Sequence, residues 1–257
     1  MVNFRRLSKN VGLVHHNNEK NISNKINKIN KFNKFILTPI NYNKLDINYD
    51  LLKEYLKKYI KPRIEYYKET NTQNLELESG FSEWWIKKSS YGTKIGDGNA
   101  PMDVITKKNN AIDTMCLCLN GNMSNEKSIM QNFGNSGNNL DTYFNQKNHI
   151  KVIRMFITDY INKIKNFSIN YKVPLTKLYY CIFISTKTNV YLSCFKININ
   201  NIIYINSHGF TKSMKSINIK NFIDDKYGNV KLYKSKKRLE LRIKKDVINS
   251  FNTIQII

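Results

Sequence analysis

Acidic residues and glycines gather in the middle of this chain. Between Glu76 and Asp141 there are eight acidic and six basic residues and seven of the ten glycines, although the whole chain has 42 Lys and Arg against 19 Asp and Glu. Two aspartates in this stretch, Asp103 and Asp113, stand ten positions apart. Paired carboxylates bind hard divalent cations such as Mg²⁺. Such a site, surrounded by bases that attract phosphates, predicts metal-assisted chemistry on a phosphate ester.

A β-hairpin is the element that must bring these two aspartates together. The β-branched and apolar residues at 101–106 and 111–119 predict two strands with a tight connection at 107–110. Asp103 would then start the first strand and Asp113 would lie within the second. Their carboxylates would be close enough to share one cation, with the phosphate supplying further oxygen ligands.

The remaining hydrophobic patterns predict an α+β (mixed α/β) domain built around one central sheet. Residues 1–36 are rich in Lys and Asn and contain one acid, so we expect a flexible basic arm, followed by a single domain at 37–257. The predicted helices are 49–61, ended by Pro62, 81–88, with Ser79 and Gly80 at its start, and 141–165; the predicted strands also include 177–185, 189–199 and 238–244.

Composition restricts the class of protein. Hydrophobic residues make up 41% of the chain, enough for a sizeable core, and no window reaches 18 consecutive apolar residues, so we expect no transmembrane helix. The start of the chain lacks the apolar core of a secretion signal. The four cysteines contain no CxxC pair, which favours buried reduced thiols in a cytoplasmic protein over a zinc site.

The net charge of +23 predicts binding to nucleic acid, because basic side chains displace the counterions of a phosphate backbone. Part of the lysine excess could instead reflect an AT-rich genome, and an anionic membrane surface is the competing partner. The residues expected to contact the nucleic-acid backbone, with a solvated basic face as the alternative, are Lys107, Lys108, Lys234, Lys236, Lys237 and Arg238.

Two short segments resemble a known family. Residues 101–103 (Pro, Met, Asp) are similar to the first motif of the PD-(D/E)XK nuclease superfamily, with one residue inserted after the proline, and 113–115 (Asp, Thr, Met) occupy the place of the second. In this superfamily an acid on a preceding helix often completes the metal site, a place that Glu83 matches, with Glu78 as the alternative. The resemblance covers residues 78–135 and points in particular to the type II restriction endonucleases.

This resemblance implies a restriction-endonuclease-like fold, in which helices flank a central mixed β-sheet. It implies Mg²⁺-dependent cleavage of phosphodiester bonds in double-stranded DNA, with Asp103, Asp113 and Glu83 as metal ligands. Such enzymes usually dimerise, so a homodimer is expected, and a cognate DNA methyltransferase is the expected genetic partner.

The chain departs from the family's pattern at Met115, where the family usually has a lysine that orients the attacking water. Three explanations stay open. Lys94 or Lys127 could reach the site from elsewhere in the chain and act in catalysis. The protein could be an inactive relative. Otherwise the alignment fails, and the two aspartates belong only to a polar hairpin.

Residues 126–133 predict a helix opened by Ser124. Its Gln131 and Asn132 could read adenine edges or contact phosphates, and the alternative is an ordinary amphipathic helix.

Two functions therefore compete. The first is a metal-dependent endonuclease of the restriction type, which the acidic, glycine-rich stretch favours. The second is a non-enzymatic basic nucleic-acid-binding protein, ribosome-associated or organellar and RNA-binding, which Met115 favours.

Overall fold

The computed structural model describes residues 34–70, 75, 77–95, 100–120, 123–124, 127–128, 138–234 and 238–257. The chain divides into two units after Lys34, of which the second, Phe35–Ile257, is compact and contains nearly all the described residues. Residues 1–33 of the predicted basic arm (1–36) lie outside the described residues. Phe35 and Ile36, which the prediction assigned to the arm, are buried in the second unit.

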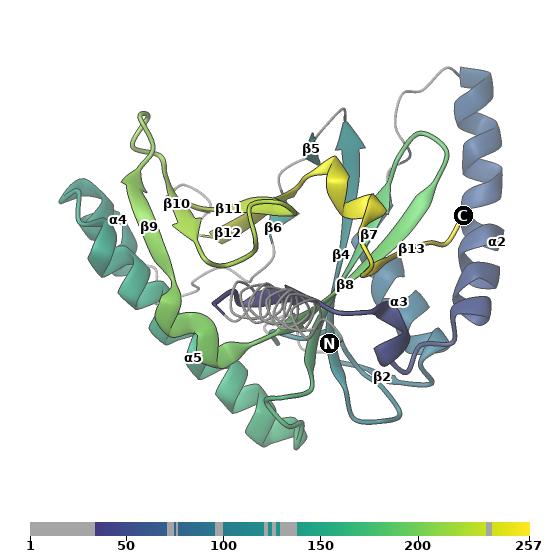
Figure 1. Ribbon diagram of the computed structural model, residues 1–257, viewed down its shortest axis with the longest axis horizontal. Coiled ribbons are helices and arrows are strands. Elements are labelled where there is room, and N and C mark those ends of the chain that lie inside the picture. Colours follow the sequence, from purple (N-terminus) through teal and green to yellow (C-terminus); the bar gives the residue numbers. More distant parts are fainter. Residues whose placement is uncertain are drawn as a thin grey trace, which may run out of the picture. The chain divides into compact units, whose positions relative to one another are not determined.

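The second unit contains two pairs of consecutive α-helices, each followed by a run of strands (Figure 1). The α-helices are α2 (Tyr49–Thr70), α3 (Ser79–Ser89), α4 (Asn138–Asn145) and α5 (His149–Tyr171). The strands are β1 (Leu37–Pro39), β2 (Thr93–Lys94), β3 (Val104–Ile105), β4 (Ala111–Asn120), β5 (Met123–Ser124), β6 (Lys127–Ser128), β7 (Leu178–Ser185), β8 (Val190–Ile197), β9 (Asn206–Phe210), β10 (Ser216–Lys220), β11 (Gly228–Tyr233), β12 (Arg238–Ile243) and β13 (Thr253–Gln255).

The main sheet has the order β1-β8-β7-β4-β3-β2, with β13 also pairing with β8 and β5 with β4. β4 and β7 pair in parallel from Ala111 opposite Leu178 to Cys118 opposite Ser185, whereas β3–β4 and β7–β8 are antiparallel. A parallel pair needs a long crossover connection, and the segment that contains α4 and α5 provides it. The prediction of an α+β fold with a mixed sheet and helices is confirmed.

A second sheet is entirely antiparallel, with the order β6-β12-β11-β10-β9. It connects to the main sheet through Ser124 of β5, whose Oγ accepts a hydrogen bond of 2.8 Å from the Ile243 backbone N–H of β12. The prediction of a helix at 126–133 is wrong for Lys127 and Ser128, the two residues of this range that the structure describes. These two residues pair with Leu241 and Glu240 as a strand, because the edge of β12 offers them backbone partners.

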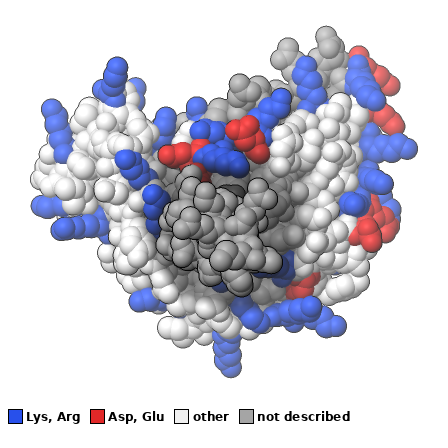
Figure 2. All heavy atoms as spheres, viewed as in Figure 1, with Lys and Arg blue, Asp and Glu red and all other residues white. Residues whose placement is uncertain are grey.

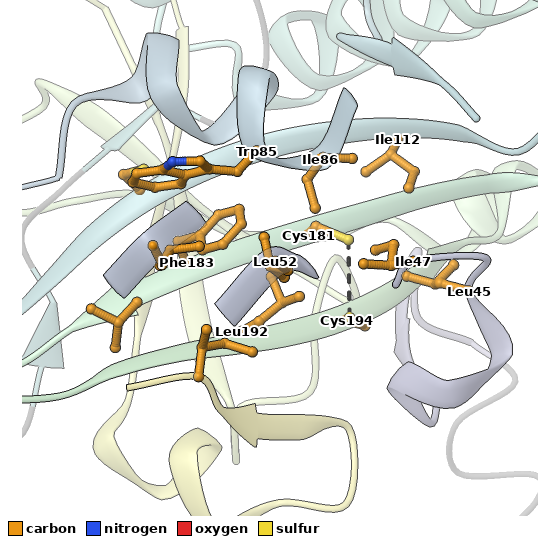
Figure 3. Packing of buried hydrophobic residues seen from close by; sticks show 14 of the residues in the cluster. Leu45, Ile47, Leu52, Trp85, Ile86, Ile112, Cys181, Phe183, Leu192 and Cys194 are labelled. Atoms are coloured by element: carbon orange, nitrogen blue, oxygen red, sulfur yellow. Dashed lines mark hydrogen bonds between the residues drawn. The ribbon is translucent and has the colours of Figure 1, made fainter. Parts of the chain in front are cut away.

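The side chains of β4 alternate between the two faces of the main sheet. Ile112 and Cys116 belong to a core shared with α2, α3, β7 and β8, in which Trp85 and Phe183 are in edge-on contact with ring centroids 5.4 Å apart (Figure 3). Asp113 lies on the other face, where it lines a hollow together with Tyr160 of α5. The sheet therefore has α2 and α3 on one face and α5 on the other.

Two predicted helix boundaries are wrong. Pro62 was expected to end the first helix, but α2 continues to Thr70 with the proline inside it. The Arg63 guanidinium lies 3.6 Å from the Tyr59 ring centroid and pairs with Glu78 at 3.0 Å, contacts that hold the second half of the helix. The long helix predicted at 141–165 is two helices, since Lys147 between them has a left-handed φ of 56°.

The four cysteines are buried free thiols, as predicted. Cys181 and Cys194 lie opposite each other on β7 and β8, with their sulfur atoms 3.9 Å apart (Figure 3). None of the helices in the described ranges is both long enough and apolar enough to cross a bilayer.

Candidate active site

Asp103 is fixed by its backbone between β2 and β4. Its N–H donates to the Ile112 carbonyl at 3.0 Å, and its own carbonyl accepts from the Ile95 N–H at 2.7 Å. The next hydrogen bonds to β4 are made by the Asp103 side chain instead of by its backbone. Asp103 Oδ2 accepts hydrogen bonds from the Thr114 N–H at 2.8 Å and from the Thr114 hydroxyl at 3.0 Å. These contacts orient the carboxylate toward β4.

Asp113 lies beside Asp103, close enough for the two carboxyl groups to influence each other's pKa. Burial, and next the negative charge of Asp103, raise the pKa of Asp113 well above its ordinary value. Burial also raises the pKa of Asp103, although the Thr114 N–H and hydroxyl act against this rise. Two carboxyls in such contact share a proton more readily than isolated ones, and a divalent cation can take the place of that proton.

Glu83 of α3 and Lys94 of β2 lie beside this pair. Lys94 Nζ is 2.6 Å from Glu83 Oε2, and the charge of Glu83 acts on both aspartates. The hydrogen bond to Glu83, and then its charge, raise the pKa of Lys94, and Asp103 adds to the effect. The structure therefore brings Glu83, Asp103, Asp113 and Lys94 into one cluster.

The position of Glu83 follows from how α3 attaches to the sheet. The neighbouring Ser82 is fully buried, and its hydroxyl lies 3.0 Å from the Thr114 hydroxyl on β4. Thr114 thus contacts both α3 and Asp103. The sequence analysis gave no role to Ser82 or Thr114, although the place of Thr114 directly after Asp113 was a signal that could have found it.

Met115 lies two residues after Asp113 on β4 and therefore on the same face of the main sheet. Its sulfur accepts a hydrogen bond of 3.1 Å from the buried Tyr180 hydroxyl, on the face of the sheet that α5 covers. Its thioether therefore does not stand in for a lysine. Lys94, one of the two lysines named from the sequence, lies near the aspartates and pairs with Glu83. The other, Lys127, lies in β6, and its side chain falls outside the described residues.

A partly open hollow adjoins Asp113, with about 250 Å³ of empty space that includes open solvent. Its walls are mostly apolar and aromatic. The lining residues are Leu37, Pro101, Met102, Asp113, Tyr160, Tyr180, Ile197 and Phe222. The low polarity of these walls explains why burial dominates the raised pKa of Asp113.

The donor set suits Mg²⁺ rather than a transition metal. Among the residues that the structure describes, no three His, Cys, Asp or Glu side chains form a group able to hold a metal ion. Glu83 instead pairs with Lys94, which leaves the oxygens of Asp103 and Asp113 as donors. Mg²⁺ keeps several of its waters and is usually bound by one or two carboxylates together with substrate phosphates. Two adjacent aspartates fit that requirement.

Glu78, the alternative to Glu83, has other partners. Its Oε1 accepts from Arg63 at 3.0 Å and from the Tyr59 hydroxyl at 3.3 Å. It therefore belongs to the contact between α2 and the start of α3.

The residues expected to contact nucleic acid are spread over several elements. Lys107 and Lys108 are exposed in the β3–β4 turn. Lys234 Nζ donates to Asn145 of α4 at 2.6 Å. Arg238 pairs with the buried Glu240 at 2.8 Å, so its charge is offset within the protein. The remaining predicted contacts, Gln131, Asn132, Lys236 and Lys237, lie outside the described residues.

Comparison with known proteins gives no match to a family model, a curated protein or a solved structure.

Proposed function

We propose that this chain is a Mg²⁺-dependent endonuclease of the restriction type, which cleaves phosphodiester bonds in double-stranded DNA. One observation carries the proposal: the carboxyl groups of Asp103 and Asp113 lie close enough to raise the pKa of Asp113, with the ion pair of Glu83 and Lys94 beside them. A polar hairpin without catalytic purpose gives no reason to bury two acids against each other, because ionised carboxylates are costly to bury. Binding of a divalent cation and a phosphate offsets that cost.

Asp103 and Asp113 would hold the cation, which when bound lowers the pKa of water and offsets charge on the phosphoryl oxygens. The Thr114 N–H and hydroxyl keep the Asp103 carboxylate oriented. The Lys94 ammonium, held by Glu83, supplies the positive charge near the phosphate that Met115 cannot supply. In this assignment Glu83 positions Lys94 and need not be a metal ligand itself.

Binding of the DNA rests on the charge of the chain. Figure 2 shows Lys and Arg side chains spread widely over the visible face, with fewer Asp and Glu side chains among them. A net charge of +23 favours a polyanion through counterion release. Cutting both strands of a duplex takes two active sites, so the proposal includes a homodimer, and a cognate methyltransferase to protect the host's own sites. The four free thiols suit a reducing compartment such as the cytoplasm.

The test is cleavage of supercoiled plasmid in Mg²⁺ and in EDTA. Discrete fragments that require Mg²⁺ and disappear in Asp103→Asn and Lys94→Met support the proposal. Lys165→Met, an exposed lysine of α5, is the matched control and should cut as the parent does. Mobility shifts that persist in EDTA, with no cleavage in Mg²⁺, would instead support a non-enzymatic basic nucleic-acid-binding protein, for which the charge alone is sufficient.

A further inference from the structure

A strip of aromatic side chains runs along the outer side of α3 and past its end. Phe81, Trp84, Lys88 and Tyr91, together called the aromatic strip, follow one another at spacings of three, four and three residues. This spacing places Phe81, Trp84 and Lys88 along one side of α3, whereas Tyr91 lies beyond the end of the helix with a left-handed φ of 51°. The exposed fractions are 36% for Phe81, 40% for Trp84 and 67% for Tyr91, and Lys88 is exposed as well. Trp85, the next residue along α3, is fully buried, and its ring stacks on that of Phe81 with centroids 6.0 Å apart.

The rings of the strip are held in place from beneath. The Trp84 ring packs edge-on against Tyr55 of α2, with centroids 5.0 Å apart, and Phe81 packs against Tyr59 at 4.3 Å. A ring fixed in this way loses little conformational entropy when a ligand stacks on it. The rings of the strip are therefore preorganised for a ligand that stacks on them.

Positive charge accompanies the rings. Lys88 Nζ lies 5.9 Å from the Trp84 ring centroid. Neither Lys88 nor Lys87 forms an ion pair with an acid in the described part of the chain, whereas Arg63 and Lys94 nearby are paired with Glu78 and Glu83. Rings flanked by uncompensated ammonium groups match a ligand that alternates flat bases with phosphates.

The strip also adjoins the candidate active site, because Trp84 follows Glu83 directly on α3 and Tyr91 leads into β2, which carries Lys94. We propose that the aromatic strip binds unpaired bases of a single-stranded nucleic acid, with Trp84 and Tyr91 stacking on bases and Lys87 and Lys88 contacting phosphates. Its role in placing a strand at the aspartates rests on the proposed function; the binding itself does not.

Tryptophan fluorescence tests this directly, since the chain has two tryptophans, one in the strip and one buried. The protein is titrated with a short oligo(dT) in EDTA, where no cleavage occurs. Stacking should quench the emission of Trp84. Trp84→Leu should abolish the quenching and weaken binding at least about fivefold, the effect expected for one stacked base. Trp85→Phe should keep the quenching, and Ile203→Ala, an exposed residue of another segment, serves if that core variant does not fold.

An abasic oligonucleotide of the same length separates stacking from charge attraction. It should bind more weakly than oligo(dT) and leave the fluorescence unchanged. Equal affinity for the two oligonucleotides, or unaltered oligo(dT) binding by Trp84→Leu, would overturn the proposal. So would a loss of self-association in Trp84→Leu, measured by sedimentation without nucleic acid, because the strip would then face a second copy of the chain.

The strip and the endonuclease can fail separately. Asp103→Asn should lose plasmid cleavage and keep full quenching by oligo(dT). Quenching in a chain that never cuts plasmid supports the strip and contradicts the endonuclease, whereas cutting without quenching overturns the strip alone.

Discussion

Thr114 offers the sharpest test of the candidate site, because one hydroxyl joins α3, β4 and Asp103. Thr114→Val keeps the shape of the side chain and removes this hydroxyl. Two interactions disappear, the 3.0 Å hydrogen bond to Asp103 and the 3.0 Å contact with Ser82. The backbone hydrogen bond from the Thr114 N–H to Asp103 stays in place.

The expected loss of stability follows from these contacts. A hydrogen bond to a charged group contributes about 1.5–3 kcal/mol and one between neutral groups about 0.5–1.5 kcal/mol. The added methyl group offsets up to about 0.8 kcal/mol of this through burial. The free energy of unfolding of Thr114→Val should therefore fall by about 2 kcal/mol. Urea denaturation followed by circular dichroism measures it, with Thr114→Ser, which retains the hydroxyl, as the control.

The same variant should shift the pH dependence of cleavage. The Thr114 hydroxyl is one of the groups that keep the pKa of Asp103 from rising further. Its loss raises that pKa, so Asp103 ionises, and becomes able to hold a cation, only at higher pH. The acid limb of the pH–rate profile should move upward in Thr114→Val and stay in place in Thr114→Ser. A stability loss below about 0.5 kcal/mol, smaller than one ordinary hydrogen bond, would refute the assigned contacts, as would an unmoved acid limb.

Three further predictions concern the rest of the fold. Because burial raises the pKa of Asp113, ionisation of this group opposes folding: its favourable contribution is present below the unfolded pKa and is lost as the pH rises through the folded one. Asp113→Asn should therefore flatten the fall in urea midpoint above about pH 4, and an unchanged slope would contradict the burial. Arg238→Ala removes contacts of 2.8 and 2.9 Å to the Glu240 carboxylate, which is 1% exposed, and should lower the free energy of unfolding by about 3 kcal/mol. Adding Glu240→Gln to the same chain should restore part of this loss. Full stability in Arg238→Ala would show that the ion pair contributes little. Pro62→Ala should raise the thermal midpoint, since alanine restores the backbone hydrogen bond to Lys58 that a proline inside a helix cannot donate, and a lowered midpoint would mean that the proline's rigidity outweighs it.

The hairpin that carries the two aspartates could be predicted because the residues that specify it lie close together in the sequence. Apolar runs on either side of 107–110 give two strands, and the spacing of Asp103 and Asp113 gives their proximity. The position of Lys94 beside Glu83 and the aspartates could not be predicted from the sequence. It depends on how β2 pairs with β3, with Lys94 opposite Val104, and β2 is a two-residue strand without a hydrophobic pattern of its own.

Other features depend on contacts between distant segments. Apolar and charged residues alternate along 238–244, yet Glu240 on the charged side is buried. Arg238, two residues earlier on the same side of the strand, compensates its charge. Along α5, isoleucines recur at helical spacing from Ile150, yet Ile150 is 54% exposed, whereas Val152, Phe156 and Tyr160 are buried. A helix with apolar residues on several sides leaves this choice to its neighbours.

The parallel pairing of β4 with β7 has a consequence for the order in which the chain folds. The β3–β4 hairpin closes a short loop, whereas the pairing of Ala111 with Leu178 must first close a loop that includes two helices. Loop closure costs more entropy for the longer segment, so the hairpin should form first and the β7 strand should dock later. During refolding the two aspartates would thus meet in water, and Tyr180 would exclude that water only in the last step.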